Sequence, residues 1–207
     1  MNLKHSLLLT LLAVVGCGGS EARPDAGASL SDSGSTTADA GNGGADGGGA
    51  APTCADYCAT VTQNCTAQDE QYESSAACLA TCAALVPGAM ADRMGNTLGC
   101  RAYHAGAAAT NPTVHCPHAG PGGGGVCGTN CDSFCALALA ICSGPNQIYT
   151  STADCMTECG IVPDTTRYTT AAKNPGSAAC FVYYLQHDAV DPAQCLANLS
   201  HTTAVCD

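Results

Sequence analysis

The residues of this chain best suited to chemistry lie in the segment YHAGAAATNPTVHCPHAG, residues 103–120. This segment holds three histidines, His104, His115 and His118, around one cysteine, Cys116. His115 and His118 are three positions apart, so they share one face of any helix that contains both. Imidazole nitrogens grouped in this way can bind Zn²⁺ or Cu²⁺. The segment therefore predicts a candidate metal site on the three histidines.

A structural role for the same residues is the interpretation that the sequence favours. Three histidines leave one metal coordination position open, and no nearby carboxylate pattern completes the set. A thiolate from Cys116 would complete it, but Cys127 would then lack a disulfide partner. In a chain this rich in alanine, His104 and His115 can instead fill space, and His118 can cap carbonyl groups at a helix end. The sequence leaves both alternatives open and predicts no other cofactor.

No other motif predicts catalysis. The cysteines form C-x3-C pairs rather than the C-x-x-C of thioredoxin-like enzymes, and no C-x-x-C-H haem motif occurs. The glycine-rich stretch 120–128 lacks the Lys-Ser/Thr ending of a phosphate-binding loop, so it predicts a flexible loop. Nothing resembles the Gly-x-Ser-x-Gly motif of serine hydrolases. The residues therefore favour a non-enzymatic protein.

The composition is typical of a protein that folds in an oxidising compartment. The 207 residues include 17 cysteines, no tryptophan and only 4% aromatic residues. Large side chains for a core are scarce, so we expect disulfides to supply part of the stability. The formal net charge is −11, whereas nucleic-acid-binding proteins carry clusters of Lys and Arg. We therefore expect no nucleic-acid partner.

Sixteen of the cysteines form a duplicated pattern. The first five have counterparts further along the chain at one constant offset, and the last three have counterparts at a slightly larger offset. These matched spacings indicate an internal duplication, with a few residues gained in one loop. We call the two copies repeat 1, residues 54–130, and repeat 2, residues 131–207. Their cysteines are Cys54, Cys58, Cys65, Cys78, Cys82, Cys100, Cys116 and Cys127 in repeat 1, and Cys131, Cys135, Cys142, Cys155, Cys159, Cys180, Cys195 and Cys206 in repeat 2.

Each repeat carries the signals of about four short helices. In residues 54–65 the apolar and cysteine positions recur at i, i+3, i+4 and i+7, which is one face of a helix. A second C-x3-C helix is expected before Pro87, which stops it. A third helix is expected around Cys100, and a fourth begins at Pro112, a residue favoured in the first helical position. Repeat 2 has corresponding segments, so the sequence predicts an all-α fold.

The C-x3-C spacing also predicts part of the disulfide pattern. Both sulfur atoms of such a pair lie on one helix face, so two antiparallel helices can be joined by two disulfides. For the other cysteines the sequence does not decide among the pairings, since eight cysteines allow about a hundred. The pairs that we expect are Cys54–Cys82, Cys58–Cys78, Cys65–Cys100 and Cys116–Cys127 in repeat 1, and Cys131–Cys159, Cys135–Cys155, Cys142–Cys180 and Cys195–Cys206 in repeat 2.

The chain begins with features of an exported protein. Residues 1–16 contain an apolar run that is too short to span a membrane and has the form of a signal peptide. The run ends in VVGC, which resembles the lipobox of bacterial lipoproteins. By this resemblance Cys17 would be acylated and would anchor the protein to a membrane. Residues 17–53 consist mostly of Gly, Ala, Ser, Thr, Asp and Asn, which predicts a disordered tether.

These observations lead to one expected architecture and two expected functions. The fold should be all-α and disulfide-rich, with two tandem homologous helical units. The chain resembles uncharacterised cysteine-rich bacterial lipoproteins, which implies a lipid-anchored position in the cell envelope, at the outer membrane. The expected function is an extracytoplasmic binding or structural module with an unknown protein or envelope partner. The alternative is a metal-binding or electron-transfer accessory protein that uses His104, His115 and His118.

Overall fold

The predicted all-α, disulfide-rich fold is confirmed. The computed structural model describes residues 51–165, 167–173, 176–199 and 206, which fall within one compact unit, residues 44–207. These described residues form eight α-helices and no β-strand. The α-helices are α1 (Cys54–Asn64), α2 (Ser75–Cys82), α3 (Leu98–Ala107), α4 (Pro112–Ala119), α5 (Asn130–Ile141), α6 (Thr152–Cys159), α7 (Ala178–Val190) and α8 (Cys195–Leu199). Short 3₁₀ turns lie at η1 (Ala67–Asp69), η2 (Gly123–Gly125), η3 (Gly144–Asn146) and η4 (Pro192–Gln194).

Local capping signals set the start of several helices. The side chains of Thr53, Ser74 and Thr97 each accept a hydrogen bond from a backbone N–H three residues further on, at the starts of α1, α2 and α3. Helix α5 begins with a capping box between Thr129 and Asp132. Helix α4 begins at its proline, as predicted, because the first residue of a helix needs no N–H donor.

All eight disulfides among the described residues lie within a repeat, and both repeats have the same pairing. In each repeat two disulfides join the first helix to the second, as the C-x3-C spacing predicts. Helix α1 is joined to α2, and α5 to α6, so each repeat starts with a stapled helical hairpin. These four confirmed pairs are Cys54–Cys82, Cys58–Cys78, Cys131–Cys159 and Cys135–Cys155.

The other four expected pairings are wrong. Repeat 1 has neither Cys65–Cys100 nor Cys116–Cys127, and repeat 2 has neither Cys142–Cys180 nor Cys195–Cys206. In each repeat the partners are exchanged, so that the end of the first helix is joined to the fourth helical segment. The third helix is joined instead to a cysteine near the end of the repeat. The observed pairs are Cys65–Cys116, Cys100–Cys127, Cys142–Cys195 and Cys180–Cys206.

The rotation of α3 about its axis explains the exchange. Helix α3 turns Ala105 towards α1, where the side-chain amide of Asn64 donates a hydrogen bond of 2.9 Å to the Ala105 carbonyl oxygen. Cys100 and His104 lie one turn apart on another face of α3, close to Cys127. The spacing of cysteines along the chain cannot reveal this rotation, because it follows from tertiary packing.

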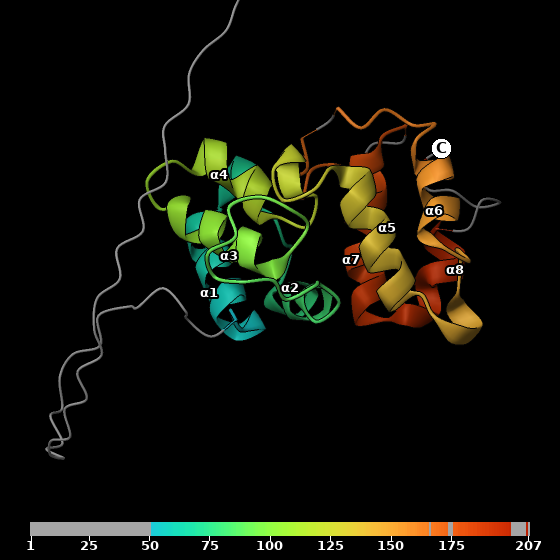
Figure 1. The fold of residues 1–207 in the computed structure, drawn as a ribbon. Helices are drawn as coiled ribbons and strands as arrows, with labels where there is room; N and C mark the ends of the chain where they lie inside the picture. Colours follow the sequence, from blue (N-terminus) through green and yellow to red (C-terminus); the bar gives the residue numbers. More distant parts are fainter. Residues whose placement is uncertain (1–50, 166, 174–175, 200–205, 207) are drawn as a thin grey trace, which may run out of the picture. The chain divides into compact units, whose positions relative to one another are not determined.

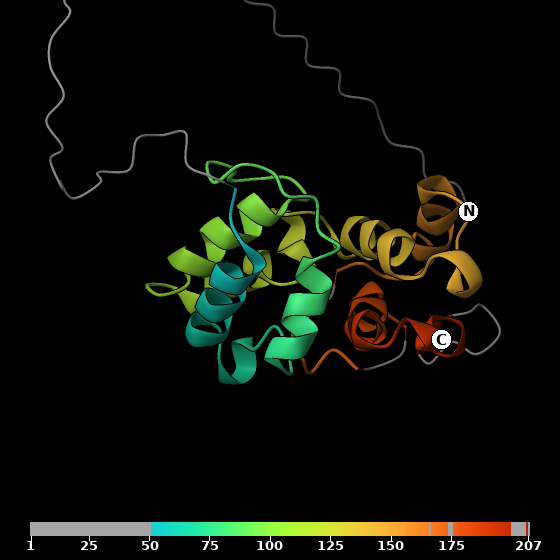
Figure 2. The same cartoon turned by 90° about the horizontal axis from the view of Figure 1, so that it is seen from below.

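The two repeats pack against each other through α2 and α7 (Figure 1). A view from below shows α2 of repeat 1 beside the helices of repeat 2 (Figure 2). The core between the helices is rich in cysteines and alanines, with some leucines and valines and rings such as Tyr57, Tyr72 and Phe134. The Tyr57 hydroxyl lies 2.8 Å from that of Tyr72 and donates to the Ala119 carbonyl oxygen at 2.6 Å. The hydroxyl groups of these two buried tyrosines are therefore hydrogen-bonded, as buried tyrosines usually are.

The segment between α6 and α7 reaches from repeat 2 to repeat 1. Arg167 forms an ion pair with Asp69, and Lys173 forms one with Glu73 at 3.0 Å. The backbone N–H of Thr170 also donates to the Glu70 carbonyl oxygen at 3.0 Å. Residues of repeat 2 therefore take part in the surface around repeat 1.

Candidate metal centre

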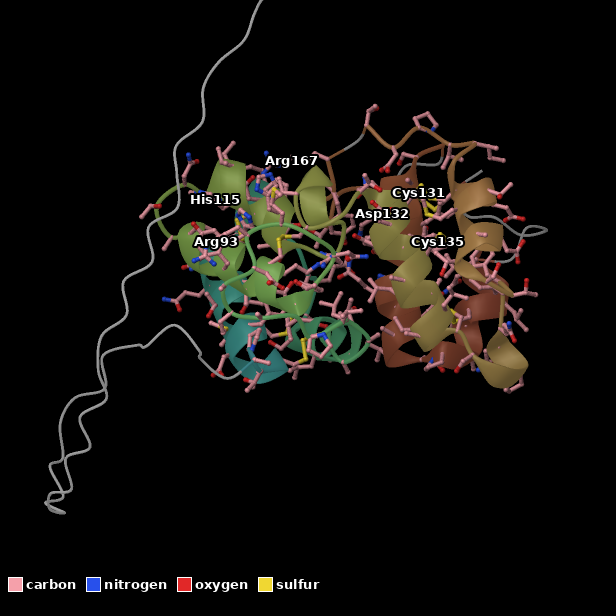
Figure 3. The ribbon with its side chains drawn as sticks, in the orientation of Figure 1. Arg93, His115, Cys131, Asp132, Cys135 and Arg167 are labelled. Atoms are coloured by element: carbon pink, nitrogen blue, oxygen red, sulfur yellow. A yellow bond between two sulfur atoms is a disulfide. The ribbon has the colours of Figure 1, made fainter. Side chains whose placement is uncertain are left out.

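The structure brings all three predicted histidines together. His104 lies in α3, and His115 and His118 lie in α4, which packs against α3. One ring nitrogen from each histidine lies within 4.8 Å of the other two. The shortest approach joins His104 Nδ1 and His115 Nδ1 at 3.0 Å. Figure 3 shows His115 on the repeat 1 side of the molecule, with Arg93 and Arg167 near it.

The surroundings of His104 determine which nitrogen can bind a metal. Its Nε2 lies 3.2 Å from the backbone carbonyl oxygen of Arg93. A carbonyl oxygen only accepts hydrogen bonds, so the neutral ring carries its proton on Nε2. The lone pair is then on Nδ1, which points at the other histidine. Metal-binding histidines are commonly oriented by this kind of contact between the second nitrogen and a carbonyl group.

Two of the histidines have lowered pKa values. Burial lowers the pKa of His104, which is 6% exposed, and the charges of His115 and Arg93 lower it further. Burial also lowers the pKa of His118, with further contributions from the other two histidines and from Arg167. Both effects favour the neutral imidazole, which is the form that binds metal ions.

A glycine-rich turn closes over His118. The Nδ1 atom of His118 is buried and has no hydrogen-bond partner. Gly124 has a φ of +55°, and a β-carbon there would lie 2.8 Å from His118 Cδ2 and 2.9 Å from the Pro117 carbonyl group. Glycine leaves room for this approach and adopts this left-handed backbone conformation without strain. The stretch predicted as a flexible loop therefore contains the turn η2, which packs against the candidate site.

Arg101 holds that turn in place. Its side chain is fully buried and donates hydrogen bonds to the carbonyl oxygens of Gly120, at 3.1 Å, and Pro121, at 3.3 Å. It also donates to the hydroxyl oxygen of Ser133 in α5 at 2.9 Å. Burial lowers the pKa of Arg101. The matching position in repeat 2, directly after the third-helix cysteine, is Phe181, so this contact belongs to repeat 1 alone.

Cys116 is not part of the ligand set. Its sulfur is bonded to Cys65, and this disulfide fixes α4 to the end of α1. Cys100 and Cys127 also lie near His104, but they are bonded to each other. A disulfide sulfur is not the thiolate that binds a metal ion. Among the described residues, the candidate site therefore consists of three imidazoles without an anionic protein ligand.

The sequence did not reveal the two arginines around the cluster. Arg93 lies in the segment before α3, and its guanidinium group lies 3.5 Å from the ring centre of Tyr103, beside His104. Arg167 comes from repeat 2, in the segment where repeat 2 gains its extra residues. That length difference was the only sequence signal for this segment. Both contributions depend on tertiary contacts.

A pocket of about 420 Å³ lies beside the cluster. His118 forms part of its wall, together with the apolar residues Val114, Pro117 and Tyr168. Arg167 also lines it. The pocket therefore has walls from both repeats and shares one histidine with the candidate metal site.

Repeat 2 lacks histidine at the three matching positions. By the cysteine spacing, the counterparts of His104, His115 and His118 are Tyr184, Gln194 and Ala197. The fourth helical segment is also divided there, because η4 and α8 replace the single helix α4. Fold and site together define a disulfide-stabilised helical repeat protein with a histidine cluster in repeat 1.

Comparisons with known proteins relate the first repeat to a fungal family. Residues 49–132 match the BfoA family C-terminal domain, a match that includes all of repeat 1 but less than half of the chain. The chain is 41% identical over 71 residues to the "Aurasperone B biosynthesis cluster protein A" of Aspergillus niger. It is 39% identical over 71 residues to the "Bifonsecin B biosynthesis cluster protein A" of Aspergillus brasiliensis.

These similarities are partial. The alignments cover 34% of this chain and 23% and 24% of the two relatives, so the chain spans about a quarter of the curated relatives it matches. No solved structure matches the chain.

The comparisons contradict two expectations drawn from the start of the sequence. The relatives are fungal biosynthesis cluster proteins, so the resemblance to bacterial lipoproteins is wrong, and so is the outer-membrane location that it implied. Residues 1–50, which include the predicted signal peptide, Cys17 and most of the predicted tether, lie outside the described residues. Within the described part of the chain, no helix has both the length and the apolar character needed to cross a membrane.

Proposed function

We propose that this protein is an exported, disulfide-stabilised binding module that holds one Zn²⁺ or Cu²⁺ ion on His104, His115 and His118. The observation that carries the proposal is the convergence of three ring nitrogens within 4.8 Å of one another. Two neutral nitrogen ligands on a tetrahedral ion lie about 3.3 Å apart, close to the 3.0 Å between the Nδ1 atoms of His104 and His115. Three imidazoles suit zinc and copper better than calcium or magnesium, which prefer oxygen ligands.

The environment of each ring supports a metal over simple packing. The Arg93 carbonyl group orients His104, which leaves its Nδ1 lone pair directed into the cluster. His118 Nδ1 is buried without a partner, an arrangement that costs free energy unless something binds there. A metal ion bound through these two Nδ1 atoms would give both of them a partner. Packing alone accounts for the buried rings but not for the unpaired nitrogen.

The relatives supply a setting rather than an activity. Their names place them in biosynthesis clusters and state no metal or substrate. Export is supported by the cysteine content, because eight disulfides form and persist in oxidising compartments. We therefore propose an accessory role in metal binding outside the reducing cytosol.

Isothermal titration calorimetry of the oxidised full chain with Zn²⁺, and separately with Cu²⁺, tests the proposal. We expect each protein chain to bind one metal ion with a sub-micromolar dissociation constant. The His115→Ala/His118→Ala variant should lose at least about 100-fold in affinity, since even outer-shell changes cost 10- to 100-fold. His187→Ala in repeat 2 is the matched control, because this histidine is 47% exposed at the side chain and lies outside the cluster.

Circular dichroism of each variant checks that the helices remain. Absence of binding to the oxidised wild-type chain contradicts the proposal. So does binding that the double variant retains, because the metal would then be held elsewhere.

A further inference from the structure

Among the described residues, Arg167 is the one cationic side chain that lines the pocket beside His118. Asp69 engages one amino group of its guanidinium, which has five N–H donors in all, so the other donors remain for a ligand. Asp164 also lines the pocket. Its Oδ2 accepts from the Cys131 N–H at 3.3 Å, at the start of α5, and its Oδ1 is shielded from solvent. The positive group that a ligand in the pocket can meet is therefore Arg167.

His118 connects the pocket to the candidate metal site. Its ring lines the pocket, while its Nδ1 is buried and unpartnered. Nε2 is thus the nitrogen left for a ligand in the pocket. An imidazole that binds a metal through Nδ1 carries its proton on Nε2. Metal binding would therefore present an N–H donor to the pocket.

We propose that this pocket binds a small organic carboxylate with an apolar body. The carboxylate accepts hydrogen bonds from Arg167 and from His118 Nε2–H, and the body packs against Val114, Pro117 and Tyr168. A volume of about 420 Å³ is within the range of small-molecule sites.

The coupling between the two sites rests on the proposed metal function. The metal fixes the ring tautomer that donates to the carboxylate, and a carboxylate hydrogen-bonded to Nε2–H makes the ring a better metal ligand. The two ligands should therefore bind cooperatively, and each should raise the affinity for the other by the same factor.

Calorimetric titration of the oxidised full chain with benzoate, with and without saturating Zn²⁺, tests the proposal. We expect benzoate to bind about 10-fold more tightly to the zinc-loaded protein, within the usual range of coupling between sites. Benzamide has the same body without the charge and should bind at least about 10-fold more weakly than benzoate.

Two variants locate the site. Arg167→Gln should weaken benzoate binding about 10-fold, because it removes the charged donor. Lys173→Gln is the matched control, because Lys173 belongs to the same segment and is also paired with a carboxylate, but does not line the pocket. It should leave benzoate affinity unchanged.

The outcomes separate the two proposals. Zinc binding without benzoate binding overturns the proposed carboxylate site but agrees with the proposed metal site. In a further outcome, the protein binds benzoate through Arg167 and yet binds no zinc. That result would support the carboxylate pocket, but it would overturn the metal function and the coupling between the sites. Equal binding of benzoate and benzamide, or equal effects of the two variants, also overturns the carboxylate site.

Discussion

The two repeats have the same disulfide scaffold and different chemistry. The sequence separations of their paired cysteines are 28, 20, 51 and 27 residues in repeat 1, and 28, 20, 53 and 26 in repeat 2. On this common frame, repeat 1 carries three converging imidazoles, whereas repeat 2 has Tyr184, Gln194 and Ala197 at the matching positions. The disulfide scaffold is therefore common to both repeats, whereas the candidate site consists of residues by which the repeats differ.

Removal of one corresponding disulfide from each repeat gives the largest expected effect. The disulfide Cys65–Cys116 closes a loop of 51 residues and Cys142–Cys195 one of 53, so replacement of either pair by alanine should lower the free energy of unfolding by about 4 kcal/mol. Urea denaturation measures this loss. Zinc affinity should fall only in the repeat 1 variant, because Cys116 lies between His115 and His118 in α4. Equal loss of zinc affinity in both variants would contradict the comparison.

Substitution of a buried carboxyl group in repeat 2 gives the second-largest expected effect on stability. Asp188 is fully buried, and its Oδ1 accepts a hydrogen bond of 2.6 Å from Asn198 while its Oδ2 has no partner. Burial raises its pKa from 3.8 to about 6. The folded state thus favours the protonated form, and stability is lost as the pH rises from about 4 through 6. The matching position in repeat 1, counted from the third-helix cysteines Cys100 and Cys180, is Ala108 and carries no such group.

Asp188→Asn should therefore raise the free energy of unfolding at pH 7 by roughly 2 kcal/mol, and the gain should shrink towards pH 4. Urea denaturation across this pH range measures it. A gain that is independent of pH would show that ionisation of Asp188 is not the cause.

The glycine turns of the two repeats offer the smallest and most specific test. Gly124 and Gly144 have φ values of +55° and +59°, so alanine at either position should cost roughly 1 kcal/mol in backbone strain. Only at Gly124 would the new methyl group meet His118, since the space around Gly144 is open. Zinc affinity should fall about 10-fold in Gly124→Ala and stay unchanged in Gly144→Ala, as measured by calorimetry. Equal zinc affinities of the two variants would show that the turn at Gly124 does not influence the metal site.

The sequence predicts the parts of this fold that depend on local spacing. Helical periodicity and the C-x3-C pairs determine the helical hairpin and two disulfides of each repeat, because both sulfurs of a pair must lie on one helix face. The pairings of Cys65 and Cys100 depend on how α3 packs against its neighbours, a packing that includes the hydrogen bond from Asn64 to the Ala105 carbonyl oxygen. No spacing along the chain contains that information.

The candidate site follows the same division. The sequence draws attention to His104, His115 and His118 because repeat 2 lacks them, but it leaves a metal centre as the alternative to a structural role. Arg167 could not be predicted, because it reaches the pocket from the other repeat. The packing of Gly124 against His118 cannot be predicted for a related reason. A run of glycines predicts a flexible loop as long as its tertiary contacts are unknown.

X-ray absorption at the zinc edge, on the 1:1 complex of the oxidised chain, identifies the atoms that bind the metal. We expect three imidazole nitrogens at about 2.0–2.1 Å, one further light atom, and no sulfur. A sulfur shell at about 2.3 Å would contradict this expectation, because the metal would then be held by reduced cysteines of the scaffold rather than by the histidines of repeat 1.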